Sequence, residues 1–134
     1  MSCSPFRTTT THVVPSTHQE RVHRRVIIES PFAGDIETNQ AYARAALRDC
    51  LLRGEAPLAS HLLYTQPGVL DDSNPEERVH GIDAGLAWGC LADATVVYGD
   101  LGISTGMRYG IERAEREGRP VEYRQLADWK RRAR

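Results

Sequence analysis

The chain has 134 residues, of which 40% are apolar, 26% charged and 7% aromatic. These fractions are typical of a soluble globular domain and exclude a largely disordered or collagen-like chain. Seventeen basic and eighteen acidic side chains leave a net charge of −1, which argues against a nucleic-acid footprint over the whole protein. No apolar run approaches the ~18–20 residues that span a bilayer, and the N-terminus lacks the apolar core of a signal peptide. We therefore expect a cytoplasmic protein without a membrane partner.

The cysteines and histidines give no metal-binding pattern. Cys3, Cys50 and Cys90 form an odd set without CxxC spacing, which predicts neither a zinc site nor a disulfide framework. His12, His18 and His23 lie in the N-terminal segment and could bind a metal in principle, but we interpret them as solvated side chains. The sequence therefore predicts no metal and no cofactor.

The predicted domain begins after an N-terminal tail. Residues 1–24 show no sustained apolar period, so they cannot bury enough surface to offset the entropy of ordering them. Residues 25–29 are a β-branched run of strand length, and turn residues follow at 30–34. Asp35 is positioned to cap a helix over residues 36–52, which Gly54 ends. Strand, loop and helix in this order open an α/β unit.

The middle of the chain predicts a second strand and a second helix. Residues 57–63 are interpreted as a short strand, followed by an irregular loop over residues 64–73. Asn74 caps the next helix, and Pro75 occupies its first position, where a missing N–H group costs nothing. This helix is expected to run to about residue 91. The apolar residues at helical spacing, which we expect to face the core, are Val79, Ile82, Leu86 and Cys90.

Two further strands and a third helix complete the predicted domain, residues 25–126. Residues 94–98 are apolar enough for a central parallel strand, and Ser104 or Thr105 caps a helix to about residue 117. Residues 121–123 form the last strand, and residues 127–134 are a short basic tail. The order predicts an α/β three-layer sandwich with about four parallel strands and right-handed crossovers.

Candidate binding residues lie in the loops that follow the strands, because ligands bind open parallel sheets beyond the carboxyl ends of their strands. The N–H groups that open the helix after Ile103 attract anions, although neither the P-loop nor the GxGxxG pattern is present. A capped helix after a flexible turn explains the same residues. Likewise, Phe32 could stack on a planar ring or anchor its loop, and His61 could bind a ligand or be structural. The predicted ligand-binding residues are Ser30, Phe32, Gly34, His61, Gly99, Ser104, Thr105, Gly106 and Met107.

Four segments, taken in order, resemble one family. They are residues 26–32 (VIIESPF), 56–62 (APLASHL), 74–78 (NPEER) and 104–107 (STGM). In order and spacing they resemble the small nucleoside 2-deoxyribosyltransferase-like proteins, particularly bacterial and phage members, over residues 25–123. The resemblance implies a flavodoxin-like, Rossmann-like fold that binds nucleosides or nucleotides at its strand ends and assembles as a homo-oligomer.

The resemblance also implies a chemistry. Active relatives cleave or exchange the N-glycosidic bond of (deoxy)nucleosides or their monophosphates, using a glutamate of the third helix as nucleophile and an aspartate as general acid. Matching residues 104–107 to the family's helix start puts Gly110 at the position of that glutamate. Glu112 lies about 200° further around the helix, so it reaches the same place only after a register change. The candidate catalytic residues are Asp83, in the second helix, and Glu112.

Gly110 leaves alternative functions open. The first is an N-glycosidase or deoxyribosyltransferase-like enzyme. The second is a catalytically inactive module that binds or sequesters a nucleotide. A third is an oligomerising α/β domain without a small ligand.

Overall fold

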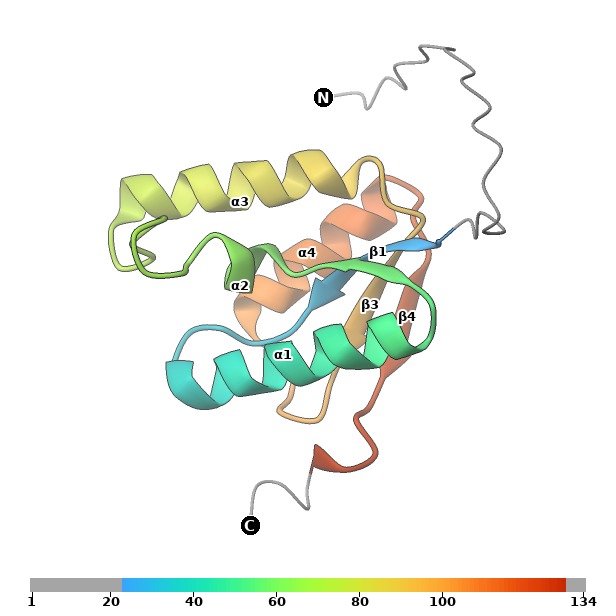
Figure 1. Ribbon diagram of the computed structural model, residues 1–134. Helices are drawn as coiled ribbons and strands as arrows, with labels where there is room; N and C mark the ends of the chain where they lie inside the picture. The colour runs from blue at the N-terminus through green and yellow to red at the C-terminus, as the bar shows by residue number, and fades with distance from the viewer. Residues whose placement is uncertain (1–22, 130–134) are drawn as a thin grey trace, which may run out of the picture.

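The computed structural model describes residues 23–129, and within them the predicted α/β fold is confirmed (Figure 1). The four strands form one parallel sheet in the order β2-β1-β3-β4. The elements in chain order are β1 (Arg25–Glu29), α1 (Ile36–Leu52), β2 (Ala56–Leu58), α2 (Ser60–Leu63), α3 (Pro75–Gly89), β3 (Ala94–Tyr98), α4 (Thr105–Arg116) and β4 (Val121–Arg124). This is a flavodoxin-like arrangement with the β1–β3 pair at the centre.

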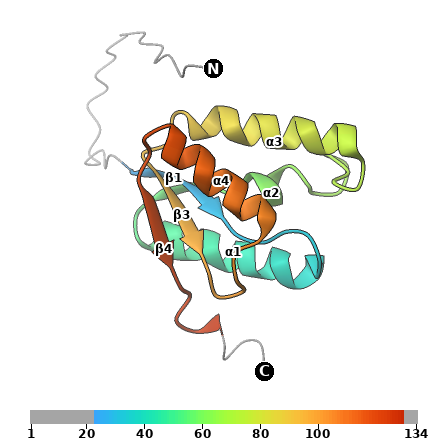
Figure 2. The ribbon, with the colours of Figure 1, turned by 180° about the vertical axis from the view of Figure 1, so that it is seen from behind.

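Helices cover both faces of the sheet, with α1 on one face and α4 on the other (Figure 2). Val26 and Ile28 of β1 pack against Tyr42 of α1, whereas Val97 of β3 packs against Met107 of α4. Because successive strand side chains point to opposite faces, the intervening β1 residues turn away from α1. The alternation therefore directs the last side chain of β1, Glu29, toward the α4 side.

The predicted helix caps are confirmed. Asp35 accepts hydrogen bonds from the Thr38 backbone N–H at 3.2 Å and from its hydroxyl at 2.7 Å. Gly54 follows α1 with a φ of +81°, a left-handed conformation that suits glycine after a helix end. Ser104 caps α4 by accepting from the Met107 N–H at 3.2 Å. Local sequence thus fixes where these two helices begin or end.

The prediction of a strand over residues 57–63 is only partly right. β2 ends at Leu58, and the chain then forms the single helical turn α2, in which the N–H groups of Leu63 and Tyr64 bond to Ala59 and Ser60 carbonyls. The turn is held by a close approach of α3. A Cβ atom on Gly85 would lie 2.6 Å from the Ser60 hydroxyl oxygen. This packing partner is distant in sequence, so local pattern could not predict it.

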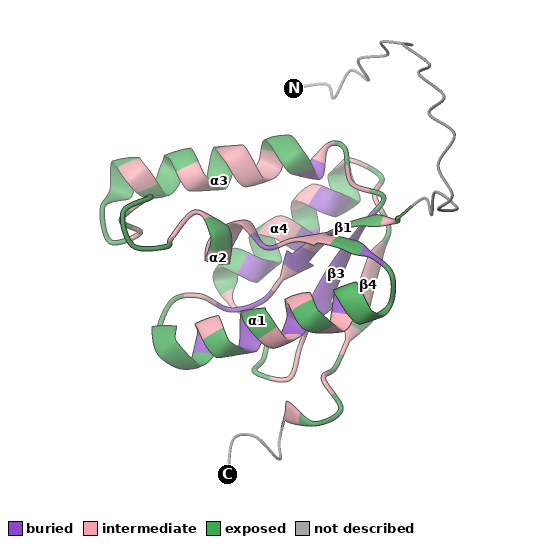
Figure 3. Ribbon diagram, viewed as in Figure 1, coloured by how far each residue is buried: buried purple, intermediate pink, exposed green. Residues whose placement is uncertain are grey.

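The predicted buried face of α3 is only partly right, because Leu86 and Cys90 are half-buried but Val79 and Ile82 are exposed. Val79 is 54% and Ile82 41% exposed, and the one buried residue in α3 is Gly89. Figure 3 shows the contrast with β3, which is buried along its whole length. Instead α3 makes its close contacts through glycines four residues apart, Gly81, Gly85 and Gly89. Val79, Ile82 and Leu86 therefore border an open space between α3 and the sheet and do not pack on the sheet itself.

The structure also shows where residues of the predicted C-terminal tail and the cysteines lie. Trp129, placed in the predicted tail, packs edge-on against Tyr42 with ring centroids 4.8 Å apart. Cys50 is a buried free thiol. The predicted tail at residues 1–24 lies almost wholly outside the described residues.

Within residues 23–129, no helix has the length and apolarity to cross a membrane, and no three potential metal ligands cluster.

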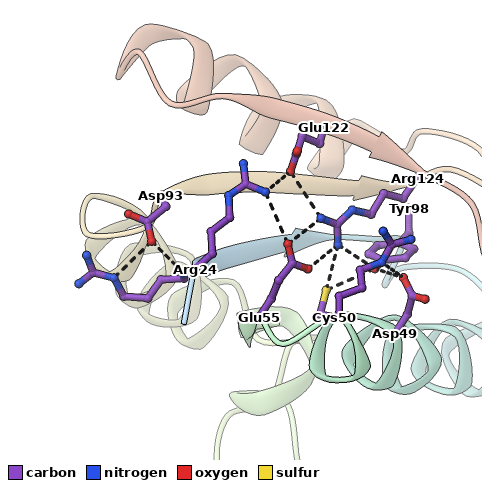
Figure 4. A network of polar contacts seen from close by, with 10 residues as sticks. Arg24, Asp49, Cys50, Glu55, Asp93, Tyr98, Glu122 and Arg124 are labelled. Atoms are coloured by element: carbon purple, nitrogen blue, oxygen red, sulfur yellow. Dashed lines mark hydrogen bonds and ion pairs between the residues drawn. The ribbon is translucent and has the colours of Figure 1, made fainter. Parts of the chain in front are cut away.

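A buried ionic network ties α1 to the sheet (Figure 4). Arg124 of β4 donates to both carboxylate oxygens of Glu55 at 2.6 and 2.7 Å, and neither side chain is more than 10% exposed. Tyr98 of β3 donates its hydroxyl to Asp49 of α1 at 2.6 Å. The hydrogen bond from Arg124 holds the pKa of Glu55 below its usual value. Both Glu55 oxygens therefore have partners.

Candidate functional site

A cavity of about 780 Å³ lies between α3 and the sheet, on the side away from α1. Its sheet side is formed by Ile27, Glu29 and Thr95. Its other walls are α2, α3, the first turns of α4 and the bend after β1. Small-molecule sites in proteins have volumes of roughly 300–1,000 Å³, so this cavity has the size of a ligand site. The predicted loop that begins at Ser30 borders it, and so does the start of α4 at Ser104, whereas residues 99–103 before that helix do not.

The cavity exists because α3 stands away from the sheet. It contacts its neighbours at its glycines, where a larger side chain would be too close to the neighbouring residue. A Cβ atom on Gly89 would lie 3.3 Å from a guanidinium nitrogen of Arg119, and a Cβ atom on Gly81 would lie 3.3 Å from Leu70. α3 therefore rests on α2, on the loop before it and on Arg119. The space between these supports and the sheet stays open.

Ser30 and His61 form a hydrogen-bonded pair at the cavity wall. The Ser30 hydroxyl oxygen lies 2.6 Å from Nε2 of His61, and Ser30 is buried. Burial of the imidazole lowers the pKa of His61 to about 4, so the ring is neutral near pH 7. The pair joins the bend after β1 to α2. It can also offer a ligand one neutral donor or acceptor from the same place.

Glu29 is the carboxyl group at the centre of the sheet side. It ends β1 and lies against α4, where its carboxyl group occupies the space that a side chain on Gly110 would need. A Cβ atom there would lie 2.5 Å from Cδ and 2.8 Å from Oε2 of Glu29. Burial raises the pKa of Glu29 to about 8, against the opposing effect of the Arg119 charge. Within the described part of the chain, no hydrogen bond or ion pair is formed by this carboxyl group.

Arg119 is a second charged group in the cavity wall. Its guanidinium donates to the Thr95 hydroxyl at 3.0 Å and to the Gly89 carbonyl at 2.7 Å, and it pairs with Glu117 at 2.6 Å. The side chain is only 8% exposed. These bonds fix the guanidinium between β3 and the end of α3, so it shapes the cavity rather than moving within it.

The start of α4 lines the cavity through Ser104, Thr105, Gly106 and Met107. The hydroxyl of Ser104 already caps the helix, but the N–H groups of Thr105 and Gly106 make no hydrogen bond within the described residues. Free first-turn N–H groups attract an anion or a ligand oxygen. Met107, with 1% exposure, closes the wall beside them.

The structure brings most of the predicted site residues to this cavity and leaves others away from it. Phe32 and His61 line it together with the α4 residues above, and Asp83 lines it from an exposed position on α3. Gly34, Gly99 and Glu112 do not line it, and Glu112 is exposed on α4.

Sequence reasoning missed Glu29 and Arg119. Glu29 carried a usable signal, because it is an acidic residue at the carboxyl end of an apolar strand and directly precedes Ser30. Arg119 gave no such signal. It follows a helix-ending glycine, where basic residues are ordinary.

The fold of this chain is similar to that of a solved enzyme structure. It is similar to the solved structure of a 2-deoxyribosyltransferase from the psychrotolerant bacterium Bacillus psychrosaccharolyticus, with a TM-score of 0.55 and 22% identity over 75% of this chain and 72% of that chain. At this identity the likeness shows a shared fold. Residues 24–124 match the family described as a domain of unknown function, DUF7768, and the chain belongs to that family. No curated protein matches the chain significantly.

Proposed function

We propose that this chain binds a nucleoside in the cavity beside α3 and cleaves or transfers its N-glycosidic bond. The observation that carries the proposal is a carboxyl-lined cavity of about 780 Å³ at the strand ends of a fold shared with a 2-deoxyribosyltransferase. Breaking a glycosidic bond develops positive charge at the anomeric carbon, which a nearby carboxylate stabilises. The carboxyl-bearing residues that line the cavity are Glu29, Asp72, Glu77 and Asp83.

The lining also supports recognition of a flat base attached to a polar sugar. Phe32, Tyr64 and Tyr109 offer aromatic surface on which a base could stack. The charge of the wall favours a neutral ligand, because three carboxyl groups besides Glu29 face two guanidinium groups, and Arg119 is already paired with Glu117. We therefore expect a nucleoside to bind more tightly than its monophosphate.

The test is incubation of the full chain with deoxynucleosides and with their monophosphates. Free base is measured by chromatography, and binding by the rise in melting temperature. We expect base release and a larger melting-temperature rise with the nucleoside. Absence of both effects with every base would refute the proposal. A Glu112→Gln variant in the same assay decides whether that residue, predicted from sequence to be catalytic, contributes.

The second candidate is an inactive module that binds or sequesters a nucleotide. The observation that favours it is that α4 places no carboxyl side chain in the cavity, since Gly110 has none and Glu112 lies outside. This alternative predicts stoichiometric binding and an unchanged ligand after prolonged incubation. Mass spectrometry of the recovered ligand separates it from the enzyme.

Homo-oligomerisation belongs to the same proposal. Two large apolar side chains at the end of α3 and in the turn after it are exposed and lie outside the cavity: Trp88, 55% exposed, and Leu91, 48% exposed. A second copy that covers them would remove this apolar surface from water. Light scattering on the purified chain measures the assembly, and a monomer at every concentration would contradict it.

A further inference from the structure

We infer that Glu29 is the catalytic carboxylate of this chain, supplied from β1 into the space that Gly110 leaves open on α4. The inference rests on the proposed function and deepens it, since it assigns the group that attacks the sugar. Three independent features support it: the fit of two distant residues, the lack of partners, and the position in the cavity.

The fit between Glu29 and Gly110 is specific. Any side chain at position 110 would begin inside the Glu29 carboxyl group, so only glycine lets that carboxyl group keep its place against α4. Glycine within a helix costs about 1 kcal/mol relative to alanine, and Gly110 has helix on both sides. Gly110 therefore lowers the stability of α4 at the position where the helix makes room for the carboxyl group of Glu29 from β1.

The environment of Glu29 differs from that of a structural carboxylate. Glu55, which directly precedes β2, is buried and has hydrogen-bond partners for both oxygens, whereas Glu29 is half-buried at the cavity. Glu29 has none within residues 23–129, although Arg119 is close enough to influence its pKa. A carboxyl group held in a cavity wall without partners keeps its lone pairs free for a ligand.

The position in the cavity allows a defined reaction. An ionised Glu29 oxygen attacks the anomeric carbon, forming a C–O bond while the C–N bond breaks and its electron pair remains on the base, which takes up a proton. A water oxygen then attacks the same carbon, the bond to Glu29 breaks, and the water gives up a proton. The products are the free base, the free sugar and the original carboxylate. If a second base attacks instead of water, the result is transfer.

The pH dependence of this step follows from the environment. The attacking form is the ionised carboxylate, and burial raises the pKa of Glu29 to about 8 in the empty cavity. The rate of base release at subsaturating substrate should therefore rise with pH and level off above about 8.

The test compares Glu29→Gln with Glu115→Gln, an exposed carboxylate on α4 outside the cavity. We expect Glu29→Gln to lower base release on the order of 10⁴-fold or more while it keeps the nucleoside-induced rise in melting temperature, and Glu115→Gln to match the wild type. In the wild type, acid quenching followed by peptide mass spectrometry should find the sugar on the peptide that contains Glu29. This adduct decides the question even if Glu29→Gln fails to fold.

The outcomes separate the two proposals. Base release by Glu29→Gln at the wild-type rate, or an adduct on another residue, overturns the role of Glu29 and leaves the proposed function intact. A wild type that neither binds nor cleaves nucleosides overturns both. The double variant Glu29→Ala, Gly110→Glu returns a carboxylate to the same space from α4, and recovery of activity over Glu29→Ala alone would support the assignment.

Discussion

The two faces of the central sheet treat carboxylates in opposite ways. On the α1 face, Glu55 is bound at both oxygens by Arg124, and its pKa is lowered. On the α4 face, Glu29 has no hydrogen bond within the described residues, and its pKa is raised to about 8. The first arrangement holds elements together, because each charge has a fixed partner. The second arrangement lowers stability but leaves a carboxyl group available to a ligand, which is typical of functional sites.

The largest expected effect comes from breaking the paired face. Glu55→Gln leaves the buried Arg124 guanidinium without its bidentate partner, and removing one member of such a pair costs roughly 3–5 kcal/mol. Urea denaturation near pH 7 measures the loss in the free energy of unfolding. The exposed Glu115→Gln control should change it by less than about 0.5 kcal/mol. Equal effects for the two variants would mean that the Arg124 network is not needed for stability.

The pH dependence of stability should distinguish the two faces by sign. The folded chain keeps the Glu29 proton up to about pH 8, whereas an unfolded glutamate releases it near 4.5, so Glu29 makes the free energy of unfolding fall as pH rises between these values. His61, with a pKa of about 4 when folded and 6.5 when unfolded, acts in the opposite direction, but only between pH 4 and 6.5.

Between pH 6.5 and 8 the Glu29 contribution is therefore unopposed by His61. We expect a loss on the order of 1 kcal/mol per pH unit there, measured by chemical denaturation at several pH values. Glu29→Gln should remove this slope. Glu55 contributes in the other direction and at lower pH: its stabilisation is present above about 4.5 and is lost as the pH falls through its lowered pKa. An unchanged slope in Glu29→Gln would show that its carboxyl group is not the cause.

A smaller effect is expected where Glu29 meets α4. Gly110→Ala places a Cβ atom where the Glu29 carboxyl group lies, so the end of the Glu29 side chain must turn away; because that end is flexible, we expect a cost of about 1 kcal/mol, the low end of the range for overpacking. In a Glu29→Ala background the same change should become neutral or stabilising. Denaturation of the two single variants and the double variant measures the coupling. Additive effects would contradict the contact.

The smallest effect is expected at the start of α4. Ser104→Ala removes the oxygen that accepts from the Met107 N–H, and loss of such a cap costs about 1 kcal/mol. Thermal denaturation measures it. Ser104→Asp is the matched control, since aspartate also caps, and it should keep most of the stability. If both variants lose the same amount, the cap is not what holds the first turn.

Much of the fold was predictable because its signals are local. The apolar run of β3, the caps Asp35 and Ser104, and Gly54 after α1 each follow from the preferences of neighbouring residues. The face of α3 was not predictable, since its contacts run through Gly85 and other glycines, whose lack of a side chain is invisible to an apolar pattern. The candidate site was found in part for the same reason. Phe32, His61 and the start of α4 follow strand ends, whereas Gly34, Gly99 and Glu112 share that local pattern without facing the cavity.

The sequence by itself determined the class of fold, the order of its elements and the edge of the sheet where a ligand could bind. Only the tertiary structure decided which carboxyl group stands at that edge. Gly110 on its own suggested a missing side chain, and Glu29 on its own the end of a strand. The two residues are 81 positions apart, and their relation appears only when β1 and α4 pack against each other, because a carboxyl group and a Cβ atom cannot occupy the same space.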